Sequence, residues 1–151
     1  MRPVSSLVRL TLVVLAMTTL GACQSTRLDG LVASNAPPEM SAPVANAIAG
    51  DMVSRFSEQI GPGTTTIALK QDNSPFGQAL ETALKNSGYA VVTDQKTDDK
   101  ARPIPLAYVV EPFEGNILVR LSTRTVDIGR AYAATPTGTT PASPLSVIRR
   151  G

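Results

Sequence analysis

The sequence predicts an α+β fold in which two helices pack on a small mixed sheet, with the element order α-β-α-β-β-β-β. Between residues 64 and 93, a β-branched run, a helical run and a second apolar run follow one another, which is typical of two parallel strands joined by a right-handed crossover. From residue 104 onward, apolar residues alternate with other residues, as in antiparallel strands. The 151 residues suffice for one such domain.

The first helix is predicted between Ser41 and Gly61. Ser41 is a good N-cap residue, and Pro43 stands in the first turn, where its missing N–H is tolerated. Gly61-Pro62-Gly63 ends the helix. Apolar residues recur every four positions and share one face with Val53, namely Val44, Ile48, Met52, Phe56 and Ile60.

The second helix lies between two predicted parallel strands, 64–70 and 89–93. Ser74 caps it, Pro75 opens its first turn and Gly88 closes it. Glu81 and Lys85, one turn apart, form a predicted surface pair. The apolar face consists of Phe76, Leu80, Ala83 and Leu84.

The antiparallel part begins with a strand of alternating residues from Ile104 to Val110, which Pro112 is expected to end. Glu114-Gly115-Asn116 predicts a turn, and 117–121 predicts the next strand. The apolar parity then switches, which requires a bulge or a turn. We expect a turn at Asp127-Ile128-Gly129-Arg130 and a returning strand over Ala131-Tyr132-Ala133. Residues 135–151 are rich in Pro and Thr and are expected to form a C-terminal tail without regular structure.

The N-terminus has the features of a secretion signal over residues 1–22. Arg2 and Arg9 precede an uncharged run from Leu10 to Leu20. These eleven residues would span only about 16 Å as a helix, roughly half of a hydrocarbon core. A signal peptide is therefore favoured over an uncleaved membrane helix.

The order Leu20-Gly21-Ala22-Cys23 resembles the lipobox of bacterial lipoproteins. This resemblance implies cleavage between Ala22 and Cys23, an S-diacylglyceryl group on the Cys23 sulfur and an N-acyl group on its freed amine. Several acyl chains would give a lasting membrane anchor, because each buried CH₂ contributes about 0.8 kcal/mol. A plain secreted protein is the alternative. The polar segment 23–40, with Pro37-Pro38, is expected to be a flexible tether to a domain over 41–134.

The charge balance argues against a nucleic-acid partner. The chain has 14 basic and 12 acidic residues, and loss of Arg2 and Arg9 with the signal leaves 12 of each. A chain without net charge lacks the basic surface that nucleic-acid binding needs. We expect the membrane, through the lipid, and other envelope proteins to be its partners.

Catalytic and metal chemistry is disfavoured by composition. The chain has no His and a single Cys, which removes most transition-metal sites and the usual catalytic triads. Gly61–Thr65 lacks the Lys of a phosphate loop and precedes a strand. Asp94, Asp98 and Asp99 lack calcium-loop spacing and alternate with Lys. No serine–lysine spacing stands out. We therefore expect no catalytic residue, cofactor, metal or small-molecule substrate.

Candidate partner contacts lie on tyrosines and near the C-terminus. Tyr89, Tyr108 and Tyr132 are either interface anchors or, as in most sheets, core packing; of these, Tyr132 is retained as a weak partner-binding candidate. Leu145 and Ile148 belong to a segment that either adds as a strand to a partner's sheet or docks on its own domain.

Besides the signal and Cys23, six stretches form an ordered pattern along the chain: 47–53 (AIAGDMV), 59–64 (QIGPGT), 74–81 (SPFGQALE), 88–92 (GYAVV), 107–110 (AYVV) and 140–145 (TPASPL). Together they resemble the TrbH family of conjugal transfer lipoproteins. The resemblance covers nearly the whole chain. Its specificity comes from the order in which these stretches follow one another.

The resemblance implies a small lipoprotein of a conjugative type IV secretion (mating-pair formation) apparatus, on the periplasmic side of a membrane. Only the lipidated Cys23 is carried over from the family. Gln24, which is not Asp, favours the outer membrane by sorting rules of enteric bacteria, and the inner membrane stays open. The alternatives are a general envelope adaptor, such as a pilot or a cell-wall regulator, and a lipid-anchored hydrolase.

Overall fold

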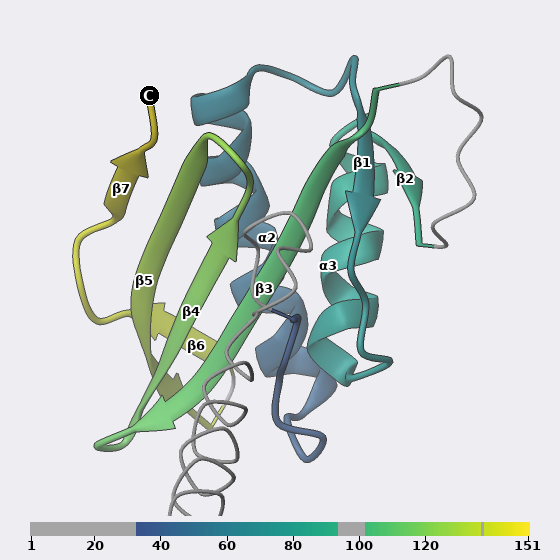
Figure 1. The fold of residues 1–151 in the computed structure, drawn as a ribbon. Coiled ribbons are helices and arrows are strands. Elements are labelled where there is room, and N and C mark those ends of the chain that lie inside the picture. Colours follow the sequence, from purple (N-terminus) through teal and green to yellow (C-terminus); the bar gives the residue numbers. More distant parts are fainter. Residues whose placement is uncertain (1–32, 94–101, 137) are drawn as a thin grey trace, which may run out of the picture.

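The computed structural model describes residues 33–93, 102–136 and 138–151. It confirms the α+β prediction: two described helices, α2 and α3, pack side by side against one face of a seven-stranded mixed sheet (Figure 1). The strand order is β2-β1-β3-β4-β5-β6, and β7 pairs with β5 beside β6. Cys23 and Ala22, together with the predicted signal, lie outside the described residues, as do Asp94, Asp98 and Asp99.

Helix α2, Ala42–Ile60, confirms the first helix prediction. Ser41 is its N-cap in extended conformation, Pro43 is in the first turn, and Gly61, with φ 94°, ends the helix. Its buried side chains lie on one face of the helix, as the period of four predicted: Ala45, Ile48, Ala49, Met52, Val53 and Phe56.

The predicted strand–helix–strand unit is confirmed by β1, Thr66–Leu69, α3, Pro75–Asn86, and β2, Ala90–Val92. β1 and β2 are parallel. The Ser74 hydroxyl oxygen accepts from the Gly77 N–H at 3.0 Å, which satisfies one of the free amides of the first turn. β1 also pairs in parallel with the start of β3, so it lies between β2 and the antiparallel strands.

β3, Ile104–Phe113, is longer than predicted, because Pro112 lies within it. The Val110 N–H donates to the Asn35 carbonyl, on the edge of β3 away from β4. The nitrogen of Pro112, two residues on, faces the same way, and the bridge at Asn35 is the last pairing described on that edge. A missing donor costs little at an unpaired edge, which explains why Pro112 did not end the strand.

The predicted turn after Phe113 is confirmed. Glu114 and Gly115 both have positive φ, 48° and 78°, and they connect β3 to β4, Asn116–Ser122. Two successive positive φ values are typical of a two-residue hairpin turn whose backbone twist matches that of the flanking strands. Glycine adopts a positive φ without strain.

The predicted turn at Asp127-Ile128-Gly129-Arg130 is wrong. β5, Val126–Thr135, runs straight through these residues and pairs with β4 along its length. The chain reverses earlier, where the Thr123 side-chain oxygen accepts from the Val126 N–H at 2.9 Å and donates to the Val126 carbonyl at 2.9 Å. A threonine hydroxyl thus closes the turn, and this reversal accounts for the parity switch.

The expectation that residues 135–151 lack regular structure is also wrong. They form β6, Gly138–Pro141, and β7, Ser146–Arg149, which pair with the second and first halves of β5 respectively. The edge of β5 supplies the pairing that this segment cannot make alone, so composition did not predict it. Two strands are therefore added to the predicted order.

The predicted tether, residues 23–40, is wrong at its C-terminal end, where the described residues belong to the domain. Asn35 forms a parallel bridge with Val109 of β3, and Ala36 is buried in the core. The folded domain therefore begins before residue 41, which was its predicted start, because free edge amides of β3 pair with this segment.

Candidate functional site

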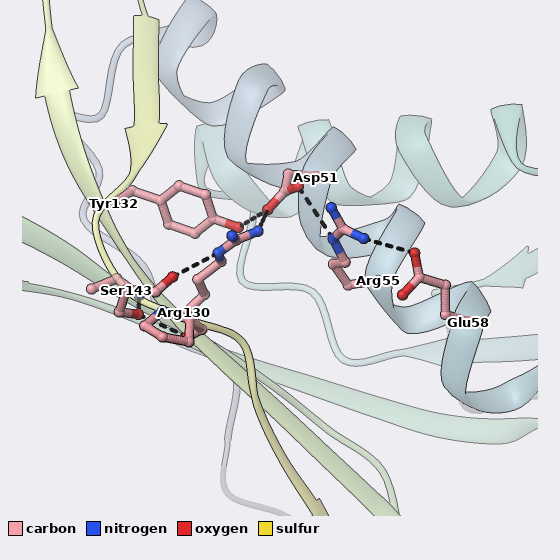
Figure 2. A network of polar contacts seen from close by, with 8 residues as sticks. Asp51, Arg55, Glu58, Arg130, Tyr132 and Ser143 are labelled. Carbon is pink, nitrogen blue, oxygen red and sulfur yellow. Dashed lines mark hydrogen bonds and ion pairs between the residues drawn. The ribbon is translucent and has the colours of Figure 1, made fainter.

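One polar cluster connects helix α2 to strand β5 (Figure 2). The Asp51 Oδ2 atom accepts from the Tyr132 hydroxyl at 2.6 Å and from Arg130 Nη1 at 2.9 Å. Arg130 and Tyr132 are two residues apart on β5, so both side chains point to the face that α2 covers. Arg55, one helical turn after Asp51, has its Nε 3.7 Å from Asp51 Oδ1 and also pairs with Glu58.

The electrostatics of this cluster keep the Tyr132 phenol protonated. Burial raises the pKa of Tyr132 above its usual range, and the hydrogen bond to the Asp51 carboxylate and its negative charge raise it further; Arg130 opposes them more weakly. A phenol with a raised pKa stays protonated, so Tyr132 donates its hydrogen bond to Asp51. This bond and the Arg130–Asp51 pair join the helix layer to the sheet.

Arg130 extends the same joint to the C-terminal loop. Its Nε donates to the Ser143 carbonyl at 3.0 Å, and the Ser143 hydroxyl oxygen accepts from the Ala131 N–H at 2.9 Å (Figure 2). One arginine thus bridges Asp51 of α2 and the loop that separates β6 from β7. Ser143 is held in place on both its backbone and its side chain.

A second cluster holds the N-terminal segment on the domain. Asp72 accepts from the Ala36 N–H at 2.8 Å, from the Ser74 N–H at 3.0 Å and from the buried Tyr108 hydroxyl. The Tyr108 N–H donates to the Ser34 hydroxyl oxygen at 3.2 Å. Burial by itself would raise the pKa of Asp72, but the hydrogen bonds from Ser74, Tyr108 and Ala36 outweigh it and keep the pKa below its usual value.

A third cluster holds the C-terminal strand. The buried Asp127 of β5 pairs with Arg150. The Arg150 backbone N–H donates to the Thr125 carbonyl at 2.8 Å, and its Nη1 donates to the Thr123 carbonyl at 3.0 Å. Among the described side chains, only one buried polar atom has no hydrogen-bond partner, and it is Asp127 Oδ1. Only the Oδ2 atom of this carboxylate therefore has a described hydrogen-bond partner.

The residues predicted to contact a partner differ in their exposure in the structure. Tyr132 is buried and bound to Asp51, so in this structure it presents no surface to a partner; Tyr89 and Tyr108 are also buried. Leu145 is partly buried against the core. Ile148 is 56% exposed on β7, which is paired with its own domain.

The stretches considered for other chemistry have structural explanations where they are described. Gly63 packs on the end of α3, where a Cβ would lie under 3.0 Å from the backbone of Gly88. Glu81 and Lys85 form the predicted pair at 2.6 Å. Within residues 33–93, 102–136 and 138–151, no three His, Cys, Asp or Glu side chains are grouped as metal ligands.

Sequence reasoning missed the three aspartates that organise these clusters. Asp51 lies beside the buried face of α2 and is itself only partly exposed, so at most a weak signal in the sequence indicated that its charge has a partner. Asp72 gave only the signal of an acidic residue in the loop between β1 and the N-cap Ser74. Asp127 gave none, because it was assigned to a turn.

No helix within the described part of the chain is long and apolar enough to cross a membrane. No solved structure matches the chain. A curated relative, "Probable conjugal transfer protein TrbH" of Sinorhizobium fredii (strain NBRC 101917 / NGR234), is 47% identical over 135 residues, which are 87% of this chain and 90% of the relative. The model of the family described as "Conjugal transfer protein TrbH" matches residues 26–151. The chain therefore belongs to the TrbH family of conjugal transfer proteins.

Proposed function

We propose that this chain is a lipid-anchored structural component of a conjugative type IV secretion (mating-pair formation) apparatus, and that it supports plasmid transfer without binding DNA itself. The observation that carries the proposal is the family match over residues 26–151, which follows a lipobox-like Leu20–Cys23. The anchor is an S-diacylglyceryl and N-acyl group on Cys23. Its partners are the membrane and other envelope proteins of the channel.

The short link to the domain supports a role close to the membrane. Ser34, the first residue with a described contact to β3, stands eleven positions after Cys23. Eleven residues span at most about 40 Å even when fully extended, so the domain would stay within that distance of the anchor. Gln24 favours the periplasmic side of the outer membrane over that of the inner membrane.

The three polar clusters support a structural role. Asp72 and Tyr108 fasten the N-terminal segment to β3, in the middle of the sheet, so a pull on the anchor would be carried by backbone and side-chain hydrogen bonds. Asp51 and Arg130 fasten the helix layer to β5. The equal numbers of basic and acidic residues after position 22 support a role without DNA binding.

The test is a Cys23→Ser variant expressed in donor cells that lack the native protein. We expect the variant to be released from the membrane fraction and plasmid transfer to fall at least tenfold, while Ser25→Ala, its matched control, keeps both at the native level. Sucrose-gradient separation of the two membranes then locates the native protein.

Two results would contradict the proposal. Plasmid transfer at the native frequency in cells without the protein would refute the role in conjugation, and growth or cell-wall defects of plasmid-free cells that carry the deletion would point to a general envelope adaptor. Membrane retention of Cys23→Ser, with an unmodified Cys23 in the native protein by mass spectrometry, would refute the lipid anchor alone.

A further inference from the structure

Both described helices cover one face of the sheet, and the opposite face, here called the open face, carries none of the described helices or strands (Figure 1). Tyr108 packs on α3 and Tyr132 binds α2, so both side chains point to the helices. Because side chains alternate along a strand, Ala107 of β3 and Asp127 of β5 point to the open face. A sheet face without a covering layer is expected to be solvated.

One row of side chains on the open face is nevertheless buried. Ala107, Ser122 and Asp127 are direct neighbours on β3, β4 and β5, and their exposed fractions are 0%, 5% and 6%. In the next row along the strands, Arg120 of β4 is exposed. Arg150 pairs with Asp127, but no described helix or strand lies over Ala107 (Figure 1). These three residues, here called the buried row, are therefore shielded from water at the centre of a face that no described element covers.

The buried row also holds an unused hydrogen-bond acceptor. The side chain of Asp127 is 8% exposed, and its Oδ1 atom is the buried polar atom without a partner among the described side chains. A buried carboxylate oxygen without a donor is costly. A stretch of polypeptide that crosses the row brings backbone N–H groups, and each of these is a donor. The row therefore suits a covering segment of backbone.

The chain before Asn35 arrives at one end of this row. Asn35 bridges Val109 in parallel with β3, so the residues before it run back toward Ala107. They cannot continue along the edge of β3, because the Leu106 carbonyl there already accepts from the Lys70 N–H. On the helix side, α3 packs against β3. The chain must therefore turn onto the open face or leave the domain.

We propose that residues 28–32 (LDGLV) turn onto the open face and cover the buried row. Departure of the chain from the domain would leave Ala107 exposed, and Ala107 is fully buried. Leu28, Leu31 and Val32 are apolar, which suits a segment that packs on a sheet better than a solvated tether. The short side chains at 107 and 122 let a backbone approach the sheet closely.

Reach and attachment favour this segment as the occupant. The row from β3 to β5 spans two strand spacings, about 10 Å, and five extended residues reach about 16 Å. The segment is joined to the edge of β3 through Ala33 and Ser34, which gives it a high effective concentration at the row. The inference does not depend on the lipid anchor. If Cys23 is anchored, residues 24–27 alone separate it from the domain.

The test compares thiol labelling at two positions of β4 on the open face, in the full-length chain. Ser122→Cys lies in the buried row, and Leu118→Cys lies two rows away, where the native side chain is 38% exposed. We expect a maleimide to label Ser122→Cys at least tenfold more slowly than Leu118→Cys. Replacement of residues 28–32 by a Gly/Ser stretch of equal length should raise the Ser122→Cys rate at least tenfold and leave the Leu118→Cys rate unchanged. Mass spectrometry of the tryptic peptide with the new cysteine separates this signal from Cys23.

Two further variants control for folding and for the path of the segment. Val119→Cys is on the same strand but points to the helices, where Val119 is 2% exposed, so its labelling should stay slow with either segment. Leu31→Cys should form a disulfide with Ser122→Cys in the same chain, at least fivefold above its yield with Leu118→Cys.

Three results would overturn the proposal. Equal labelling of Ser122→Cys and Leu118→Cys in the chain with its native segment means that nothing covers the row. Slow labelling of Ser122→Cys that survives the replacement means that another part of the chain or a partner covers it. If the replacement makes Val119→Cys reactive, the domain has opened; the disulfide between positions 31 and 122 then decides, and its absence counts against the proposal.

Discussion

The substitution Gly77→Ala tests the packing between α3 and the Asp72 cluster. By helix propensity alone, alanine stabilises a helix by up to about 1 kcal/mol relative to glycine. The φ of Gly77 is in the ordinary range, so backbone strain does not oppose the change. In this structure, however, a Cβ at Gly77 would lie under 3.0 Å from the Tyr108 hydroxyl oxygen and 3.1 Å from Asp72 Oδ1.

The magnitude follows from what must move. Tyr108 is fully buried, its ring packs edge-on against Phe76 with centroids 5.3 Å apart, and its hydroxyl donates to Asp72. Overpacking of a core costs roughly 1 to 3 kcal/mol, and loss of a hydrogen bond to a charged group costs roughly 1.5 to 3 kcal/mol. After the propensity gain is subtracted, we expect Gly77→Ala to lower the free energy of unfolding by about 2 to 4 kcal/mol.

Urea unfolding followed by far-UV circular dichroism measures this difference. Gly50→Ala is the matched control, because Gly50 lies within α2 and a Cβ there meets nothing within 4 Å; it should stabilise the chain by about 0.5 to 1 kcal/mol. In a Tyr108→Phe background the cost of Gly77→Ala should fall by about 1 to 2 kcal/mol, since the closest atom is gone. If Gly77→Ala is as stable as Gly50→Ala, the close approach to Tyr108 is refuted.

Three further predictions concern the other polar contacts. The pKa of Asp72 is lowered from 3.8 in the folded chain, so its stabilising effect is present above pH 3.8 and is lost as the pH falls through the folded pKa. The urea midpoint of the native chain should therefore drop more between pH 5 and pH 3 than that of Asp72→Asn. Equal drops would contradict this. Arg150→Ala should lower the free energy of unfolding by about 1 to 3 kcal/mol, because it leaves the buried Asp127 carboxylate unpaired, whereas Arg149→Ala should cost under about 0.5 kcal/mol; equal losses in thermal unfolding would argue against the Asp127 pair. Tyr132→Phe should cost about 1.5 to 3 kcal/mol through its lost hydrogen bond to the α2 carboxylate, and a variant as stable as the native chain in urea would exclude this bond as part of the joint.

Local signals in the sequence were sufficient for the N-terminal half of the domain. Ser41 and Ser74 mark two helix starts, the apolar period of four marks the buried face of α2, and the short strands around α3 leave the chain only a parallel arrangement. Glu114-Gly115 likewise marks a hairpin through the positive φ that glycine accepts. These features are encoded within a few residues, so they can be read without knowledge of the rest of the chain.

The C-terminal half was decided by tertiary structure. Gly129 has the appearance of a turn residue, yet it is the middle of β5, because β4 offers it a partner at Arg120 and the Thr123 hydroxyl has already closed the turn. Pro112 remains within β3 because its nitrogen faces an edge with no described pairing beyond Asn35.

Periodicity and the order of short motifs were sufficient to predict the class of fold and the family, and the anchor at Cys23 stays a prediction of the same kind. The two C-terminal strands, and the joints that Asp51, Asp72 and Asp127 make between parts of the domain, became visible only in the folded chain. A strand edge or a carboxylate is stabilised by partners distant in the sequence, and Asp51 and Tyr132, for example, are 81 residues apart.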